Sequence, residues 1–338
     1  MNKWSYFFTG TEVGLLELSI FNSIMKNSKL VVLGLSLALF FAFVQQVSAL
    51  IQADPYLTKE FTLSGKGNLE VETSGSSVSV TGVSGNQVIV DMIVKRNGKE
   101  IGSTDAEVEK LLENYILDIS KSGNTISLKV KSKSNDGWKN GNNLSLSFKV
   151  QAPIEISSQF QSSGGSISID NLKGSQQIST SGGSIRVVNS SGTVTSKSSG
   201  GSFSLTDFEG QVDVQSSGGA VKIADLRGSV SVNTSGGSVT LEDITGKITA
   251  STSGGSIRAK LLAIEEDLSF KSSGGSISAE VPAGLGLNLD LRGGRVNTHL
   301  KNFDGEMKKD LIVGKMNGGG PLISMQSSGG SISLEFMD

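Results

Sequence analysis

Cysteine is absent from this sequence of 338 residues, and histidine occurs once, as His299. The absence of cysteine excludes disulfides, thiol catalysis and a lipid anchor attached to a cysteine. Metal clusters and Ser-His-Asp sites normally use imidazole or thiolate groups, and this chain has one imidazole and no thiolate. The many serines therefore have no base to activate them, and we expect His299 to be a surface residue of a strand.

Proline and aromatic residues are also scarce: there are 4 prolines, and aromatic residues make up 6% of the chain, whereas glycine occurs 43 times. The formal net charge is −2, with basic and acidic residues mixed along the sequence. This balance favours neither nucleic acid nor an anionic membrane as a partner. No pattern in the sequence indicates a cofactor or a bound metal.

What the chain has instead is an internal repeat. The first glycine of a Gly-Gly pair recurs every 18 residues at Gly164, Gly182, Gly200, Gly218, Gly236 and Gly254. Single glycines follow the same interval at Gly174, Gly192, Gly210, Gly228 and Gly246. Two interleaved series at one fixed period are the signature of a repeat architecture.

Each repeat reads as strand, corner, strand, corner. Apolar and polar residues alternate after each Gly-Gly pair, which is the pattern of a strand with one buried face. The residues predicted to be buried there are Ile167, Ile169, Ile185, Val187, Phe203, Leu205, Val221, Ile223, Val239 and Leu241. A corner follows at Asn171, Asn189, Asp207, Asp225 and Asp243, because Asn and Asp tolerate left-handed backbone and bond their own turn.

These features predict an all-β fold, a right-handed parallel β-solenoid (β-helix) with 18-residue coils. Eighteen extended residues give about 60 Å of contour, and stacked coils lie about 4.8 Å apart. A single coil cannot bury its own aliphatic residues, so the stack must do it. The glycines supply tight corners, and no helix follows them, which argues against a phosphate-binding loop.

The N-terminus predicts export. Lys26 and Lys29 precede a largely apolar run from Leu30 to Val44, and Val47-Ser48-Ala49 places small residues at a cleavage position. This is the pattern of a secretory signal peptide over residues 25–49. An uncleaved anchor helix is the alternative. Residues 1–24 are interpreted as a misassigned N-terminal extension, and the mature chain is expected to be periplasmic, cell-surface or extracellular.

The rest of the chain divides around the repeats. Residues 50–160 are predicted to form an N-terminal β-rich cap with one short helix in "STDAEVEKLLENY", where Thr104 and Glu107 form a capping box. Asn97-Gly98 predicts a hairpin turn, and "YILDISKSGNTISLKVKS" predicts a hairpin. Residues 161–276 are the regular repeats. Residues 277–338, where the register loosens, are predicted to form irregular C-terminal coils and a cap.

Three specialised functions of β-solenoids are disfavoured by the repeats themselves. Calcium-binding β-rolls carry aspartate in both half-turns, whereas this chain has one acid per coil, as in Asp207 and Asp225. Ice binding requires a regular array of threonine, but the outward residues of the second strand vary. Polysaccharide-active β-helix enzymes build a groove from inserted loops, and residues 164–255 contain no insertion.

One segment has the composition of a ligand contact. Trp138 lies in the loop "KSNDGWKNGNN", beside Asn140, Asn142 and Asn143. A tryptophan can stack on a sugar ring while amide groups bond its hydroxyls. The other interpretation is that Trp138 packs under its own loop.

The opening "FTLSGKGNLEVETSGSSVSVTGV", the later "LSLSFKVQAPIEI", the "SGGSISI" units and the closing "GGGPLISMQSSGGSISLEF" give the chain a family resemblance. Over roughly residues 61–336 the chain resembles a bacterial β-strand-repeat family named putative adhesins, a domain of unknown function related to head GIN adhesin domains. The resemblance implies an exported solenoid and supplies no catalytic residues.

Together these observations predict a non-catalytic, adhesin-like module of the cell envelope. We expect it to make multivalent contacts with envelope carbohydrate or protein, without nucleic acid and without stable membrane insertion after signal cleavage. The alternative is a degenerate polysaccharide-active β-helix enzyme. Product release from a polysaccharide, abolished by substituting acids in the loops of residues 282–320, would decide for the alternative.

Overall fold

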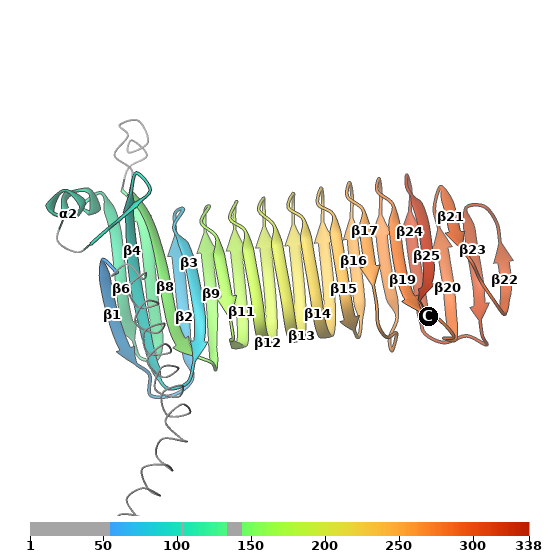
Figure 1. Cartoon of the computed structure of the whole chain (residues 1–338), viewed down its shortest axis with the longest axis horizontal. Coiled ribbons are helices and arrows are strands. Elements are labelled where there is room, and N and C mark those ends of the chain that lie inside the picture. The colour runs from blue at the N-terminus through green and yellow to red at the C-terminus, as the bar shows by residue number, and fades with distance from the viewer. Residues whose placement is uncertain (1–54, 103–104, 134–143, 338) are drawn as a thin grey trace, which may run out of the picture. The chain divides into compact units, whose positions relative to one another are not determined.

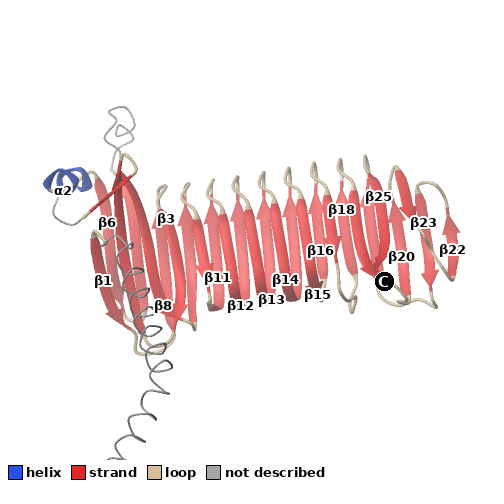
Figure 2. Ribbon diagram, in the orientation of Figure 1, coloured by secondary structure: helices blue, strands red, loops and turns tan. Residues whose placement is uncertain are grey.

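The computed structural model describes residues 55–102, 105–133 and 144–337. Two compact units divide the chain at Asp54 and Pro55, and the described residues all belong to the second unit. All the strands there join into one mixed, mostly parallel sheet, and the described part contains one short helix (Figure 2). The prediction of a β-rich repeat fold is therefore confirmed.

The strands form three groups along the chain. The first group precedes the regular repeats and contains β1 (Leu57–Thr62), β2 (Gly67–Thr73), β3 (Ser77–Val83), β4 (Gln87–Arg96), β5 (Lys99–Ile101), β6 (Tyr115–Ser122), β7 (Thr125–Ser132) and β8 (Leu144–Pro153). The second group, the repeat region, contains β9 (Ile156–Ser162), β10 (Ile167–Asp170), β11 (Lys173–Thr180), β12 (Ile185–Ser198), β13 (Phe203–Ser216), β14 (Val221–Thr234), β15 (Val239–Thr245), β16 (Ile248–Thr252), β17 (Ile257–Lys260), β18 (Leu268–Ser272) and β19 (Ile277–Pro282). The third group contains β20 (Leu287–Arg292), β21 (Arg295–Thr298), β22 (Phe303–Met307), β23 (Leu311–Met316), β24 (Leu322–Ser327) and β25 (Ser331–Met337).

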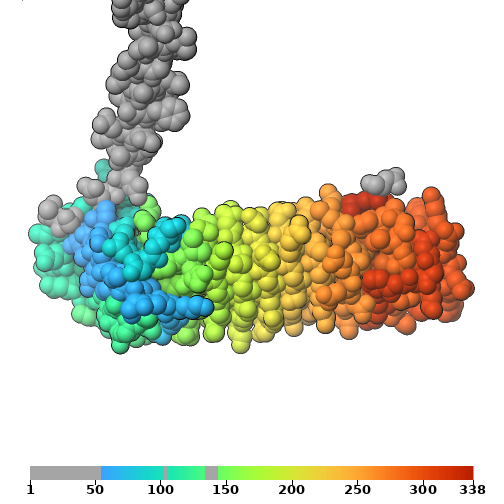
Figure 3. Space-filling view, turned by 90° about the horizontal axis from the view of Figure 1, so that it is seen from below, coloured from blue at the N-terminus to red at the C-terminus, as the bar shows by residue number. Residues whose placement is uncertain are grey.

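In the repeat region, equivalent residues of successive repeats pair in parallel. Ile167 pairs with Ile185, which in turn pairs with Phe203, so each pair is offset by 18 residues. All three side chains are at most 2% exposed, as predicted. Figures 1 and 3 show the consecutive repeats as neighbouring bands of colour from green to orange. Each repeat thus buries its aliphatic residues against the repeats on either side.

The predicted corners use left-handed backbone. Their φ angles are 58° at Asn171, 48° at Asn189, 55° at Asp207, 51° at Asp225 and 54° at Asp243. Only a few residue types adopt this conformation without strain, and Asn and Asp are among them. The predicted left-handed bend is therefore present, but in three repeats the strand continues through it: β12, β13 and β14 each contain both predicted strands of a repeat, and the register leaves Asn189, Asp207 and Asp225 unpaired at the bend.

Space, more than φ, explains the Gly-Gly pairs. A Cβ atom on Gly183 would lie 2.0 Å from the carbonyl oxygen of Gly165 in the preceding repeat. A Cβ atom on Gly182 would meet nothing closer than 3.8 Å. The second glycine of the pair therefore marks the point where successive corners touch.

At both ends the order of the strands departs from the order of the sequence. β2 and β3 lie between β9 and β10 on one side and β7 and β8 on the other, and Gly67 pairs with Ile156. β24 and β25 pair with β18 and β19, and also with β20 and β21. In Figure 1 the dark red β24 and β25 accordingly precede the orange-red β20 and β21 along the row. The closing "SSGGSISLEF" segment is thus not the last strand of the stack.

Hairpins and the helix α2 (Ala106–Leu112) occupy the N-terminal end of the described sheet. The predicted turn at Asn97-Gly98 is confirmed, with positive φ at both residues between β4 and β5, and so is the hairpin of β6 and β7. The Lys59 Nζ donates to the carbonyl of Ile119, and the Lys121 Nζ donates to the carbonyl of Thr62. These lysines cover main-chain groups of β1 and β6, which among the described strands pair only with β4 and β7 respectively.

The predicted capping box of α2 is wrong. The N-cap is Asp105, and its Oδ1 accepts hydrogen bonds from the backbone N–H groups of Glu107 and Val108. Glu107 does not bond back to the cap but accepts two hydrogen bonds from Arg96 on β4. A carboxylate at the N-cap also interacts favourably with the helix dipole, and the predicted cap residue Thr104 lies outside the described residues.

Asp105→Ala is expected to lower the free energy of unfolding of the helix by about 1 kcal/mol, because two N–H groups lose their acceptor. Hydrogen exchange over residues 105–115 is the measurement, since it isolates local opening of α2. Thr104→Ala is the control and should leave the exchange unchanged. Equal effects of the two variants would contradict the assignment of Asp105, in place of Thr104, as the N-cap.

Candidate binding face

Polar residues of the second strand of each repeat form one face of the sheet, which we call the amide face. Their side chains alternate with the buried residues of the same strands, so they point outward. One row crosses the face from strand to strand without interruption. In order of pairing it contains Glu72, Gln161, Ser179, Lys197, Gln215, Asn233, Ser251, Lys271, Gln326 and Arg292.

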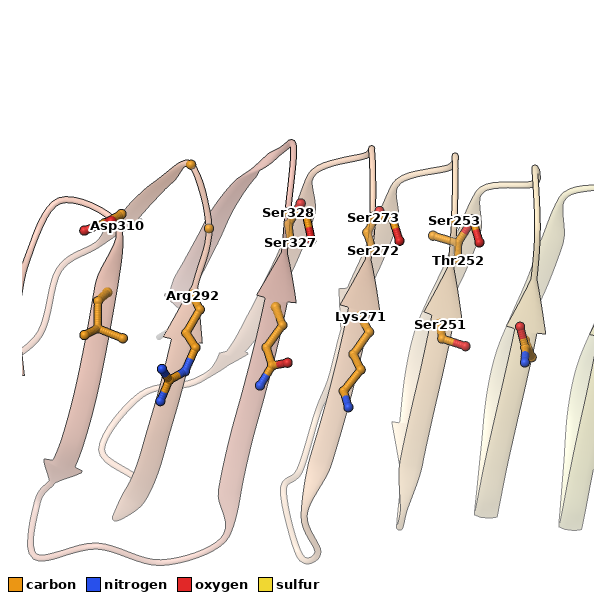
Figure 4. A pocket seen from close by; sticks show the side chains of 15 residues that line it. Ser251, Thr252, Ser253, Lys271, Ser272, Ser273, Arg292, Asp310, Ser327 and Ser328 are labelled. Atoms are coloured by element: carbon orange, nitrogen blue, oxygen red, sulfur yellow. The ribbon is translucent and has the colours of Figure 1, made fainter.

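A shallow depression, which we call the trough, follows this row. It consists of three consecutive hollows: Lys197 lines both the first and the second, and Asn233 lines both the second and the third. The third hollow has a volume of about 740 Å³ and is shown in Figure 4. One continuous depression therefore runs across successive strands instead of ending in a closed pocket.

Exposed serines of the Ser-Gly-Gly corners line one side of the trough. They are Ser163, Ser181, Ser199, Ser217, Ser253, Ser273 and Ser328. Each follows a buried serine or threonine, and all of these buried hydroxyls except the Ser216 Oγ bond main-chain groups of the corners. The Ser272 Oγ, for example, accepts from the N–H of Gly275 at 2.9 Å and donates to the carbonyl of Gly255 at 3.0 Å. Thr252, Ser272 and Ser327 each donate to a carbonyl of the preceding repeat, which holds these corners in register and aligns the exposed serines beside them.

The charges of the trough are few and spaced out. Lys131 and Glu72 form an ion pair of 2.6 Å, and Arg292 pairs with Asp290 at 2.6 Å. Within the described residues, Lys197 and Lys271 take part in no ion pair. In Figure 4, Lys271 and Arg292 extend in the same direction along the face. The trough thus offers mainly amide and hydroxyl groups, with an ammonium group at intervals.

Groups with displaced pKa values lie outside the trough. The hydrogen bonds from Arg96 lower the pKa of the Glu107 carboxyl, and burial raises the pKa of the Tyr115 hydroxyl. In the part of the chain that the structure describes, no cluster of three or more His, Asp or Glu residues could hold a metal ion. Hydrogen bonding along an extended ligand is therefore the chemistry that this face offers.

The predicted sugar-contact residues Trp138, Asn140, Asn142 and Asn143 lie outside the described residues, as does the predicted signal peptide of residues 25–49. His299 is exposed, as predicted, but it lies directly after β21 and not within a strand. The amide-face row was missed because its residues vary in type. The available signal was their position, one residue before the buried serine or threonine of each repeat.

None of the helices in residues 55–102, 105–133 and 144–337 combines the length and the hydropathy of a membrane span.

Comparison with known proteins gives a family and several structures. The family model described as Toastrack DUF4097 matches residues 99–335. A crystal structure of a putative adhesin from Parabacteroides distasonis shares 10% identity, with coverage of 82% of this chain and 96% of that chain and a TM-score of 0.44. A putative adhesin from Bacteroides fragilis shares 13% identity, with coverage of 82% of this chain and 96% of that chain and a TM-score of 0.38. A putative cell adhesion protein from Clostridium sporogenes shares 9% identity, with coverage of 83% of this chain and 99% of that chain and a TM-score of 0.20. No curated protein matches the chain.

Proposed function

Because the chain belongs to the Toastrack DUF4097 family, we propose that it is an exported, non-catalytic, adhesin-like module that binds carbohydrate of the cell envelope along the trough. The observation that carries this proposal is the uninterrupted row of the amide face, in which ten paired strands each present a polar side chain. Neighbouring side chains in such a row are about 4.8 Å apart. A regular polymer can meet such a row with the same contact many times.

The proposal includes the fold in its finer form. We interpret residues 61–336 as a right-handed parallel β-solenoid with 18-residue coils in its regular part. The parallel pairing at an offset of 18 residues supports this coil length. Right-handedness follows from the strong preference of parallel crossover connections. In this fold the trough lies across successive coils, so its length grows with the number of repeats.

Hydroxyl and amide groups suit sugars better than apolar ligands. Each hydrogen bond on an exposed surface contributes little by itself, so one sugar unit would bind weakly. Many equal contacts along one polymer raise the effective concentration of the next contact, which converts weak binding into retention. The absence of a deep pocket along the trough is compatible with this mode of binding, because a polymer needs a track and not a closed cavity.

Export completes the proposal. The predicted signal peptide of residues 25–49 would place the mature chain in the periplasm, on the cell surface or outside the cell, where envelope polysaccharides occur. Trp138 and its neighbouring asparagines stay a separate hypothesis for a sugar contact, beside the trough.

A triple variant tests the trough. In K197S/Q215S/N233S each side chain becomes serine, which the same row already carries at Ser179 and Ser251. The matched control is K173S/E209S/R227S, at paired positions that carry Ser191 in the intervening repeat. Both variants change the net charge by −1. We expect the trough variant to be retained about tenfold more weakly on an envelope polysaccharide than the wild type. The control should be retained as strongly as the wild type.

The measurement is retention of the full chain on immobilised cellulose, chitin, mannan and peptidoglycan, with soluble products assayed in the same samples. Circular dichroism confirms that both variants are folded. If the wild type binds no glycan, or if the two variants lose binding equally, the trough is not the binding site. Release of soluble sugar would instead identify a polysaccharide-active enzyme.

A further inference from the structure

A second polar face lies on the first strands of the repeats, and we call it the serine face. One row on this face consists almost entirely of serine: Ser77, Ser166, Ser184, Ser202, Ser238, Ser256, Ser276 and Ser331, with Ala220 at one position. The hydroxyls of Ser184 and Ser202 are 3.3 Å apart, and those of Ser276 and Ser331 are 3.2 Å apart. The row is therefore a ladder of exposed hydroxyls along the stack.

The next row of the serine face alternates between hydroxyls and cations. Its residues, in order of pairing, are Ser168, Arg186, Ser204, Lys222, Thr240, Arg258 and Ser278. A cation thus occurs at every second strand, and all three cations are exposed. Two strand spacings separate successive cations by about 9.6 Å.

Positive charge is segregated on this face. The serine row and the cation row contain no acidic residue between β3 and β19. The acids Asp170, Glu242 and Glu280 lie two residues further along their strands, next to the other corner. Among the described residues Arg186 and Arg258 take part in no ion pair, and Lys222 pairs with Glu242 at 2.9 Å. We call the two rows from Ser184 to Arg258 the cationic strip.

We propose that the cationic strip binds an extended linear polysaccharide that carries one acid group on every second sugar. Successive acid groups on such a polymer are one disaccharide apart, which is close to the spacing of two strands. Each acid would meet one cation, and the flanking serine hydroxyls would donate hydrogen bonds to its oxygens. This goes beyond binding in the trough, because it assigns another face and an anionic ligand.

Two other polyanions fit the strip less well. Each strand of duplex DNA carries a phosphate about every 3.4 Å of helix axis, so most of its charges would have no partner on a row with one cation per two strands. An anionic membrane normally requires apolar residues that insert beside the cations. From Ser184 to Arg258 the two rows of the strip present only serine, threonine, alanine, lysine and arginine.

The sequence provides a well-matched variant. R186S/K222S/R258S introduces the residue that Ser168, Ser204 and Ser278 already place in the same row. The control K173S/R227S/K247S also removes three positive charges, but from exposed positions outside the strip. R186K/R258K keeps the charges and should retain binding.

The experiment measures binding of the full chain to hyaluronate, which has one carboxylate per disaccharide, at low and at high salt. We expect the wild type to bind at low salt, and R186S/K222S/R258S to bind about tenfold or more weakly, since three charge contacts are lost. The control should stay within about twofold of the wild type, and added salt should weaken wild-type binding by screening.

Equal losses in the strip variant and its control would overturn the proposal, and so would equal binding to neutral dextran. Tighter binding to duplex DNA or to phosphatidylglycerol vesicles than to hyaluronate would also overturn it. The trough variant K197S/Q215S/N233S should bind hyaluronate like its own control. A failure of the strip is therefore distinguishable from a failure of the trough.

Discussion

Gly183→Ala is expected to lower the free energy of unfolding by at least about 3 kcal/mol, whereas Gly182→Ala leaves it unchanged or raises it by up to about 1 kcal/mol. The two glycines are adjacent in one Ser-Gly-Gly corner, and each substitution adds a single methyl group. They differ only in what that methyl group meets.

Backbone atoms surround the new methyl group at Gly183. Its Cβ would lie 2.0 Å from the carbonyl oxygen and 2.6 Å from the carbonyl carbon of Gly165. A backbone carbonyl cannot rotate away as a side chain can, so two successive corners would have to separate and break their register. At Gly182 the nearest atom is 3.8 Å away, and φ lies outside the left-handed region. The alanine there mainly reduces the freedom of the unfolded chain, which stabilises the fold.

Urea denaturation followed by circular dichroism measures the difference. The urea concentration at the midpoint of unfolding should fall for Gly183→Ala and stay the same or rise for Gly182→Ala. In Gly182→Ala the dependence of the unfolding free energy on urea concentration should match that of the wild type. Two variants with the same midpoint would show that successive corners are not in backbone contact. Such a result would remove the structural reason for the Gly-Gly period.

The regular repeats could be predicted from the sequence because each local signal agrees with the others. The alternation around Ile167 and Ile185 defines the buried face, and Asn171 and Asn189 define the corner between the two strands. Each of these signals recurs every 18 residues, so one reading is checked by the next repeat. A local pattern that repeats in this way leaves little freedom for the tertiary pairing.

The ends could not be predicted, because their pairings connect residues at other separations. Val78 pairs with Ile167, an offset of 89 residues, and Ile277 pairs with Ile332, an offset of 55. Periodicity cannot indicate such partners. The segments resemble the repeats only because they occupy positions between repeat-like strands, and their place depends on how hairpins and loops close over the core.

Single polar residues were also beyond sequence patterns. Gln176 is 1% exposed at a position where most repeats have an aliphatic residue. It accepts a hydrogen bond from Ser158 and donates one to the carbonyl of Ile156 at 3.0 Å. Burial of an amide is tolerated because these partners satisfy it. The pairing requires a neighbouring repeat to supply the serine, and a single strand does not reveal this.

The candidate site shows the same limit. The outward positions could be predicted, but the trough depends on the exposed Ser181 and Ser199 standing beside Lys197 and Gln215 of adjacent strands. These residues differ in type from repeat to repeat, so no motif marks them. Their common feature is their place in the register, which only the pairing of the strands reveals.

Phe203→Ala is expected to lower the free energy of unfolding by about 3–5 kcal/mol, the usual cost of a cavity left by a buried phenylalanine. Phe203 is 2% exposed and pairs with Ile185 on one side and Val221 on the other. Phe203→Val should cost less, because Val221 and Val239 occupy the equivalent positions in the next two repeats. The valine variant is thus the control, because it introduces a residue that the same row already carries.

The distribution of the loss along the chain is as informative as its size. If each repeat is stabilised chiefly by its two neighbours, the cavity should weaken the contacts of β12, β13 and β14 more than those of distant strands. Hydrogen exchange should then show lower protection over residues 185–234 than over residues 268–282. A loss below about 1 kcal/mol for Phe203→Ala would contradict the burial of this ring. A uniform loss of protection over all strands would show instead that the sheet unfolds as one cooperative unit.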